Sequence, residues 1–182
     1  MPVLPTFFYN PNAYKIGIIQ PENIVCKCCG AARNFSYKAG LYSRHRREET
    51  HPLCPWCIAD GRAAAKFNGS FVGYFDNVDP DPSHVNQPVS AASLETVSHR
   101  TPGYIALQDL FWLTHCDEAC VFLGYVGSKE LLPVWEEVLP DIVAGEWDED
   151  DVRNHLDQNG DMVGYLFQCP RCGQHRLHID AS

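Results

Sequence analysis

Several features common in enzymes and membrane proteins are missing from this chain. No apolar run approaches the roughly 20 residues that a membrane-spanning helix needs. The first ten residues lack a basic start followed by an apolar stretch, so we expect no secretory signal and a cytoplasmic protein. There is no Gly-rich phosphate loop, no Gly-x-Ser-x-Gly motif and no repeat of fixed period. No nucleophile pairs with a base at a recognisable spacing, and we expect a protein that is not an enzyme.

Positive charge is also scarce. The 14 Lys and Arg residues face 23 Asp and Glu residues, which gives a net charge of −9. Residues 1–75 carry nine basic and four acidic residues, whereas residues 76–182 carry five basic and nineteen acidic ones, a net −14. So acidic a chain repels phosphate backbones, which disfavours general nucleic-acid binding. The negative electrostatic field of the chain favours a basic partner instead.

Cysteine, by contrast, is abundant. The 182 residues suit one globular domain or two small ones sharing a core. A hydrophobic share of 45% with 20% charged residues excludes wholesale disorder. The nine cysteines are an odd number, and a reducing compartment disfavours a disulfide framework. Metal binding is therefore the natural interpretation.

Two Cys-x-x-Cys pairs, Cys26/Cys29 and Cys54/Cys57, are separated by 24 residues. Two tight turns of this kind supply the four thiolates that zinc favours in a tetrahedron, so we predict a structural Zn²⁺ site here. Free or redox-active thiols remain an alternative, as does a thioredoxin-like motif at Cys54–Cys57 before a helix. Cys28 is interpreted as a spare buried thiol, with substitution for a neighbouring ligand as the alternative.

The remaining cysteines form a second set: Cys116, Cys120, Cys169 and Cys172. Cys169-Pro-Arg-Cys172-Gly173 between two expected strands is typical of a zinc knuckle, and Cys116 with Cys120 is the only pair left to complete it. We predict a second structural Zn²⁺ site with these four ligands. His115 could replace one thiolate, but a core histidine beside Trp112 is favoured. Four protein ligands leave no position for substrate.

These motifs predict an α+β fold of small zinc-ribbon-like lobes with short helices, stapled by the two four-cysteine metal sites. We expect a zinc-ribbon-like lobe at 1–75 and a connecting loop at 76–102 rich in Asp, Pro, Ser and Asn. An acidic helical lobe at 103–182, closed by the second knuckle and a hairpin, completes one compact unit. Helices are expected at 58–67, from Gly103 to Trp112 or beyond, and at 148–158, with a broken helix at 131–143; strands are expected at 121–126, 163–168 and 176–180.

The acidic segment 129–161 holds eleven Asp/Glu and two Lys/Arg. Its densest part comprises Glu146, Trp147, Asp148, Glu149, Asp150 and Asp151. A solvated helix N-terminus accounts for about two of these carboxylates. A binding face that imitates the negative potential of nucleic acid accounts for them all, with Trp147 as its anchor and Trp135 in the core. Both interpretations remain open on the residues alone.

A resemblance bears on this choice. The residues that carry it are Leu4-Pro5-x-Phe7-x-Tyr9-x-Pro11, Cys26-Lys27-Cys28-Cys29-Gly30, residues 53–61, 100–104, Trp112, His115-Cys116, Ala119-Cys120, residues 122–127, and Gly164-Tyr165-Leu166-Phe167-x-Cys169-x-x-Cys172-Gly173. Along nearly its whole length the chain resembles the CbrC family of small bacterial proteins. It departs from that pattern mainly at 43–51, where Arg44-His45-Arg46-Arg47 is unusually basic, and loops are where partner specificity varies.

The resemblance implies no reaction, because the family has no established enzyme activity. It is associated with tolerance to a nuclease colicin, and relatives look like immunity proteins for antibacterial nuclease toxins. We therefore expect an immunity-type inhibitor, monomeric when free, whose acidic face binds a cognate basic nuclease toxin and occludes its nucleic-acid site. Neither direct nucleic-acid binding nor membrane binding is expected.

Two rival hypotheses come from other classes. In a zinc- or thiol-dependent enzyme, Cys28 or Cys54 would be reactive and one metal site open. In a zinc-ribbon nucleic-acid adaptor, Arg44, Arg46 and Arg47 would contact phosphates, which the net charge disfavours.

Overall fold

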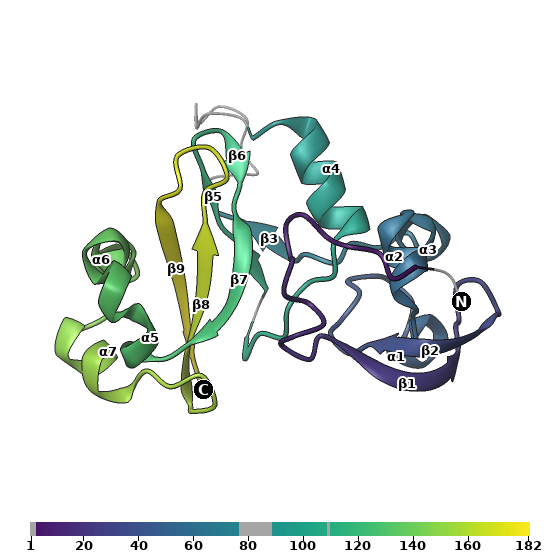
Figure 1. The fold of residues 1–182 in the computed structure, drawn as a ribbon, viewed down its shortest axis with the longest axis horizontal. Coiled ribbons are helices and arrows are strands. Elements are labelled where there is room, and N and C mark those ends of the chain that lie inside the picture. Colours follow the sequence, from purple (N-terminus) through teal and green to yellow (C-terminus); the bar gives the residue numbers. More distant parts are fainter. Residues whose placement is uncertain (1–2, 77–88, 109) are drawn as a thin grey trace.

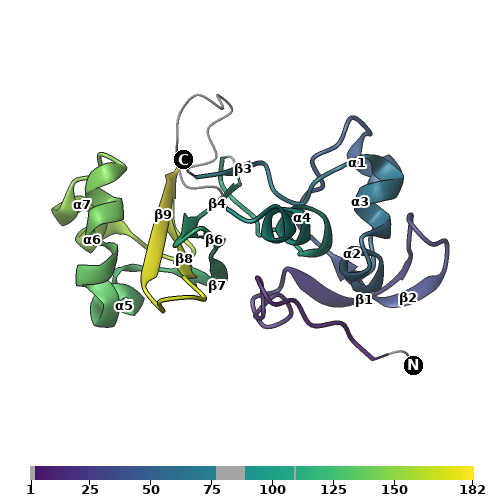
Figure 2. The ribbon, with the colours of Figure 1, turned by 90° about the horizontal axis from the view of Figure 1, so that it is seen from above.

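The computed structural model describes residues 3–76, 89–108 and 110–182. Its two lobes lie on either side of a central helix (Figures 1 and 2). The elements of the first lobe are β1 (Ile19–Val25), β2 (Ala32–Tyr37), α1 (Arg47–Thr50), α2 (Pro55–Ala59) and α3 (Arg62–Phe67). Strands β1 and β2 form an antiparallel hairpin. The central helix is α4 (Ala91–Arg100).

The second lobe is built on an antiparallel sheet with strand order β7-β8-β9. Its strands are β7 (Val121–Val126), β8 (Met162–Gln168) and β9 (His175–Ala181). The short strands are β3 (Tyr74–Phe75) and β4 (Phe111–Trp112), which pair in parallel, and β5 (Thr114–His115) and β6 (Glu118–Ala119), which form a tight hairpin. Between β7 and β8 the chain forms α5 (Ser128–Leu131), the 3₁₀ helix η1 (Leu132–Val134), α6 (Trp135–Ala144) and α7 (Glu149–His155).

The β7–β9 sheet is buried on both faces. Alternate residues of β8 point to opposite sides. Tyr165 and Phe167 join the larger core, which continues into the first lobe, and Leu166 packs against a smaller core beneath α5–α7. Helices α5–α7 lie on one side of the sheet and α4 with the first lobe on the other (Figures 1 and 2). The result is a mixed α+β fold, as the sequence predicted.

Most elements expected in the second lobe form. The structure confirms the strand at 121–126, the hairpin of β8 and β9, and the helix expected at 148–158, which is shorter. Trp135 is in the smaller core, also as expected. The helix expected at 58–67 is divided into α2 and α3, because Gly61 adopts a left-handed φ of 77°. No helix among the described residues is both long and apolar enough to cross a membrane.

The helix expected from Gly103 to Trp112 is wrong. Its backbone amides are instead used by the sheet: Ile105 N donates to Tyr125 Oη (2.9 Å), Leu107 N to Tyr165 Oη (3.0 Å) and Gln108 N to Asp180 Oδ2 (3.2 Å). A backbone bound this way cannot make the i to i−4 bonds of a helix.

The connecting loop expected at 76–102 is wrong at its end. Residues 77–88 lie outside the described residues, but residues 91–100 form α4. Ser90 begins the helix, accepting a hydrogen bond from Ser93 N (3.1 Å).

Candidate metal centres

The first cysteine cluster consists of Cys26, Cys29, Cys54 and Cys57. Their sulfur atoms all lie within 4.8 Å of one another, and Cys26 Sγ is 4.0 Å from Cys57 Sγ. Two thiolates bound to one tetrahedral zinc at about 2.3 Å lie about 3.8 Å apart. The structure thus brings the four predicted ligands together at the spacing of a tetrahedral metal site.

The first half of this cluster is a knuckle at the tip of the β1–β2 hairpin. Gly30 N donates to Cys26 O (2.8 Å), and Cys26 N donates to Ala31 O (3.0 Å). Gly30 supplies a left-handed φ of 71°, which lets the backbone reverse under both sulfurs.

The second half comes from the start of α2. Cys54 is the N-cap residue and Pro55 occupies the first turn, where a missing N–H is harmless. Cys54 N donates to Cys26 Sγ (3.3 Å), which links the two halves before any metal is considered. The first cluster therefore combines a hairpin knuckle with a helix N-terminus.

Electrostatics within the first cluster favour a bound cation. The Cys54 thiol and nearby backbone N–H groups lower the pKa of Cys26 to about 4. The pKa of Cys54 is raised, first by its hydrogen bond to Cys26 and then by burial, and burial also raises that of Cys57. Ionisation of Cys26 thus disfavours ionisation of Cys54 and Cys57. All four ionise together only with a positive charge among them.

Basic side chains surround the first cluster. Lys66 Nζ donates to the carbonyls of Lys27 and Cys28, both at 2.8 Å. Arg33 lies over the Trp56 ring at 5.1 Å, and its pKa is raised by a hydrogen bond to Cys29. A four-thiolate site holding a divalent ion carries a net −2, which these cations offset.

The second cluster consists of His115, Cys116, Cys169 and Cys172, and their donor atoms lie within 4.8 Å of one another. His115 Nδ1 is 3.2 Å from Cys116 Sγ and 3.3 Å from Cys172 Sγ. The structure groups His115, and not the predicted ligand Cys120, with Cys116, Cys169 and Cys172.

The positions of Cys120 and of the β5–β6 turn explain why His115 lies in this cluster and Cys120 does not. Cys120 is fully buried in the larger core, and its carbonyl accepts a hydrogen bond from Trp112 Nε1 (2.8 Å). Cys116 lies in the β5–β6 turn with a φ of 53°, a region that few non-glycine residues adopt. The turn brings the neighbours His115 and Cys116 to the same point.

The other half of the second cluster repeats the first knuckle. Gly173 N donates to Cys169 O and Cys169 N to Gln174 O, both at 2.9 Å, and Gly173 has a φ of 81°. Two Cys-x-x-Cys-Gly turns far apart in the sequence therefore share one backbone geometry. The clusters differ in exposure: three ligands of the first are buried, whereas Cys116 and Cys172 are exposed.

Substitution separates the two candidate ligands of the second cluster. We expect His115→Ala to lose one equivalent of bound metal, because three sulfurs remain. Cys120→Ala should keep the wild-type metal content and lose only about 1 kcal/mol of stability, since it empties a small buried volume. Metal analysis of the purified variants, with urea unfolding, checks both; metal loss in Cys120→Ala would contradict the assignment.

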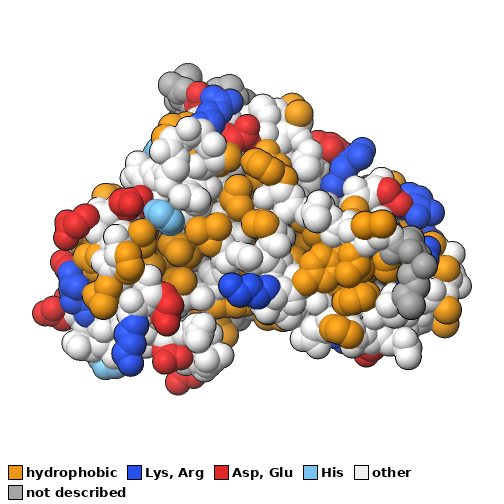
Figure 3. All heavy atoms as spheres, viewed as in Figure 1, with side chains coloured by type: hydrophobic (Ala, Val, Ile, Leu, Met, Phe, Trp, Pro, Cys, Tyr) orange, Lys and Arg blue, Asp and Glu red, His pale blue; other side chains and the backbone are white. Residues whose placement is uncertain are grey.

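The predicted acidic contacts lie on and before α7. Glu146, Asp150 and Asp151 are exposed and Trp147 is half-buried against the smaller core. Asp148 Oδ1 accepts the Asp151 N–H (3.0 Å) as the N-cap of α7. Figure 3 shows acidic side chains spread over the part of the surface that the α5–α7 unit forms.

The Glu149 carboxylate is engaged in hydrogen bonds within the α5–α7 unit. It accepts hydrogen bonds from Trp135 Nε1 (3.1 Å) and Arg153 Nη2 (2.6 Å). Arg153 in turn stacks on the Trp135 ring at 3.8 Å. Glu149 therefore stabilises α7 and is the least available of the five predicted carboxylates.

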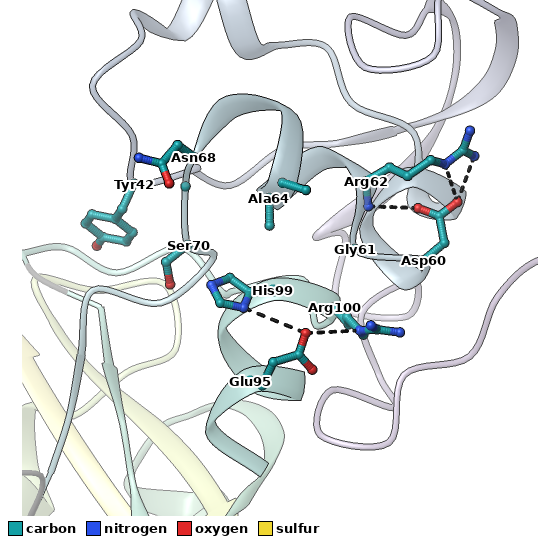
Figure 4. A pocket seen from close by; sticks show the side chains of 12 residues that line it. Tyr42, Asp60, Gly61, Arg62, Ala64, Asn68, Ser70, Glu95, His99 and Arg100 are labelled. Atoms are coloured by element: carbon teal, nitrogen blue, oxygen red, sulfur yellow. Dashed lines mark hydrogen bonds and ion pairs between the residues drawn. The ribbon is translucent and has the colours of Figure 1, made fainter. Parts of the chain in front are cut away.

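A separate groove between α3 and α4 has a volume of about 670 Å³ (Figure 4). Asp60 Oδ2 pairs with Arg62 Nη2 (2.7 Å), and Glu95 pairs with Arg100 (3.3 Å). These opposite charges neutralise one another, so the groove offers little net field to a ligand.

Comparison of the sequence with known proteins identifies the family of this chain. The model of an uncharacterised protein family, UPF0167, matches residues 4–181. The chain belongs to the UPF0167 family. It is 36% identical to UPF0167 protein PA1536 of Pseudomonas aeruginosa over 185 residues, covering 98% of both chains. It is 35% identical to UPF0167 protein Mb2317 of Mycobacterium bovis over 183 residues, covering 97% of this chain and 93% of the relative. No solved structure matches.

Proposed function

We propose that both clusters hold Zn²⁺ in a structural role. Thiolate and imidazole donors in sets of four suit zinc, and a closed tetrahedron leaves no coordination position for a substrate. Cys26, Cys29, Cys54 and Cys57 would hold one ion, and His115, Cys116, Cys169 and Cys172 the other. The repeated knuckle supports the same metal at both.

The function that these features support best is binding, not catalysis. On this proposal the protein, in the cytoplasm, is an immunity-type inhibitor whose α5–α7 unit contacts a basic nuclease toxin and keeps nucleic acid from its active site. The carrying observation is that Glu146, Asp150 and Asp151 are exposed in a segment, residues 129–161, that holds eleven acidic and two basic residues. The resemblance to the CbrC family supplies the class of partner. Such complementarity chiefly raises the rate of association.

Capture of the partner is the first test. The tagged, metal-loaded protein would be used to retain proteins from its native cell at low and moderate salt, followed by mass spectrometry. We expect one stoichiometric basic protein with nuclease-like residues. A failure to retain such a protein at either salt would contradict the proposal.

Charge reversal then tests the face. The triple variant Glu146→Lys, Asp150→Lys, Asp151→Lys should slow association with the captured toxin by about tenfold and flatten its salt dependence. Stopped-flow association at several salt concentrations measures both. A control triple variant at Glu22, Glu48 and Glu95 changes the net charge equally but lies in the first lobe and α4; equal slowing in the two variants would argue against this face.

A further inference from the structure

A second pocket lies where residues 38–42 of the first lobe meet the segment after α4. Its volume is about 330 Å³, at the small end of the range that ligand sites span. It has no lining residue in common with either metal cluster, and only Tyr42 in common with the groove between α3 and α4. The pocket is therefore separate from the sites described above.

Hydrogen bonds between the two segments hold the walls of this pocket. Tyr37 Oη donates to Gly40 O (2.8 Å) and lies 3.4 Å from Gly103 O. Leu110 N donates to Tyr42 Oη (3.2 Å). A ligand that enters a pocket with fixed walls has little protein to order, which favours its affinity.

Apolar side chains form much of the lining. Tyr104 is completely buried, and Leu41 and Ala106 pack against the larger core. Ile105 and Tyr42 also line the pocket but remain 51% and 41% exposed. A ligand that covers them removes apolar surface from water, so the pocket favours a ligand with an apolar body.

The polar part of the lining is positively charged. The described lining residues include two cations, Lys38 and Arg47, and no carboxylate. Glu22 pairs with Lys38 (2.6 Å), whereas Arg47 donates to two carbonyls, Nη2 to Lys38 O (2.8 Å) and Nη1 to Ala39 O (3.4 Å). Carbonyl oxygens leave the positive charge of Arg47 in place, and these bonds use two of its five N–H donors. A carboxylate is the planar anion that a guanidinium binds best.

We propose that this pocket binds a small carboxylate whose aromatic or branched apolar body lies against Ile105 and whose charged group is bound by Arg47. The proposal goes beyond toxin inhibition and uses no contact of the α5–α7 unit. A bound ligand contacts both segments at once, so it stabilises the junction between the two lobes.

The first test uses the metal-loaded full chain at low salt, with benzoate and phenylacetate as probes. Titration calorimetry and ¹H–¹⁵N spectra follow binding. We expect saturation by at least one probe, with the largest shifts at the amides of Gly40, Ile105 and Ala106. Saturation by neither probe, or shifts centred on other residues, would overturn the proposal.

Related small molecules separate the charge from the apolar body. Benzyl alcohol and benzylamine keep the ring but remove or reverse the charge, and acetate keeps the carboxylate without the ring. Each should bind at least about tenfold more weakly than the better carboxylate probe. Benzylamine or acetate binding as tightly as that probe would contradict the assigned ligand class.

Two substitutions of neighbouring arginines test the charged contact. Arg47→Gln removes the positive charge but keeps an N–H donor for the carbonyls, and should weaken probe binding at least about tenfold. Arg46→Gln is the matched control, because Arg46 is 81% exposed, pairs with Glu48 (3.9 Å) and does not line the pocket. It should bind the probe as the wild type does. Equal weakening in the two variants would reduce the effect to a general attraction of anions and overturn the site.

A third variant fills the pocket. A Cβ at Gly40 meets nothing within 4 Å, and the backbone there is outside the left-handed region, so a side chain is accommodated without strain. Gly40→Leu should keep both metals and melt near wild type, but lose probe binding. A folded Gly40→Leu protein with wild-type affinity for the probe would overturn the proposal, and the comparison of ligands on the wild type decides the case where this variant does not fold.

Discussion

Cys54→Ser is expected to unfold much of the protein, with loss of one metal equivalent. Cys26, Cys54 and Cys57 are completely buried members of the larger core. Without a metal, Cys54 and Cys57 stay protonated and the ion that joins the two halves of the cluster is lost. Structural zinc contributes about 10–16 kcal/mol of apparent free energy in small metal-stabilised domains. That is comparable to the whole stability of a typical domain, about 5–15 kcal/mol.

The choice of serine isolates the metal contribution. Cys54 is the N-cap of α2, and serine is a good N-cap, so the helix itself is not penalised. We expect the midpoint of thermal unfolding to fall by at least about 10 °C. Circular dichroism melts and metal analysis measure the two effects together.

Two comparisons make this expectation specific. Cys28→Ser should retain both metals and melt near wild type, because Cys28 is not a donor. Cys172→Ser should lose one metal with a smaller change in melting, because the second cluster is at the surface. The prediction fails if Cys54→Ser keeps the metal of the first cluster or melts like Cys172→Ser. Either result would show that metal binding at the first cluster does not stabilise the larger core.

The metal centres show how far sequence reasoning extends here. A Cys-x-x-Cys-Gly turn is a local structure, so both knuckles could be predicted from consecutive residues. The partner of the second knuckle depends on the β5–β6 turn, which places His115 beside Cys116 and leaves Cys120 in the core. The turn needs a left-handed backbone at Cys116, and hydrophobic periodicity does not reveal such a conformation.

In the segment after α4, contacts with residues distant in sequence also override the local sequence signal. Thr101-Pro102 is a reasonable helix start by local rules. Tyr125 and Tyr165, from strands distant in sequence, instead bind the backbone N–H groups of Ile105 and Leu107. Strands and helices with their own apolar pattern, such as β7 and α7, could be predicted because their burial follows that pattern.

A buried ion network should make Arg176 the most sensitive side chain outside the first cluster. Arg176 Nε donates to both carboxylate oxygens of Asp141 at 2.9 Å, Nη1 to Thr114 O (2.6 Å), and Nη2 to Asp76 Oδ2 (3.2 Å). The side chains of all three ionic residues are at most 20% exposed. The network joins α6, β9, β5 and the end of β3.

Arg176→Met should therefore cost about 3–5 kcal/mol, because it leaves two buried carboxylates facing each other without their cation. Asp141 also accepts the Leu177 N–H (2.8 Å), so the register of α6 on β9 depends on the same group. Urea unfolding measures the loss. Arg100→Met is the control: its partner Glu95 is exposed, and the change should stay within about 0.5 kcal/mol.

Two further substitutions separate the effect of the lost positive charge from the effect of lost packing. Adding Asp76→Asn and Asp141→Asn to Arg176→Met removes the uncompensated charges and should recover part of the stability. Because Thr114 precedes His115, Arg176→Met should also speed metal loss from the second cluster to a chelator, while leaving the first cluster unchanged. If Arg176→Met and Arg100→Met are equally stable, the network is not a structural link between the sheet and α6. If metal loss is unchanged, the second cluster is positioned by its own turns alone.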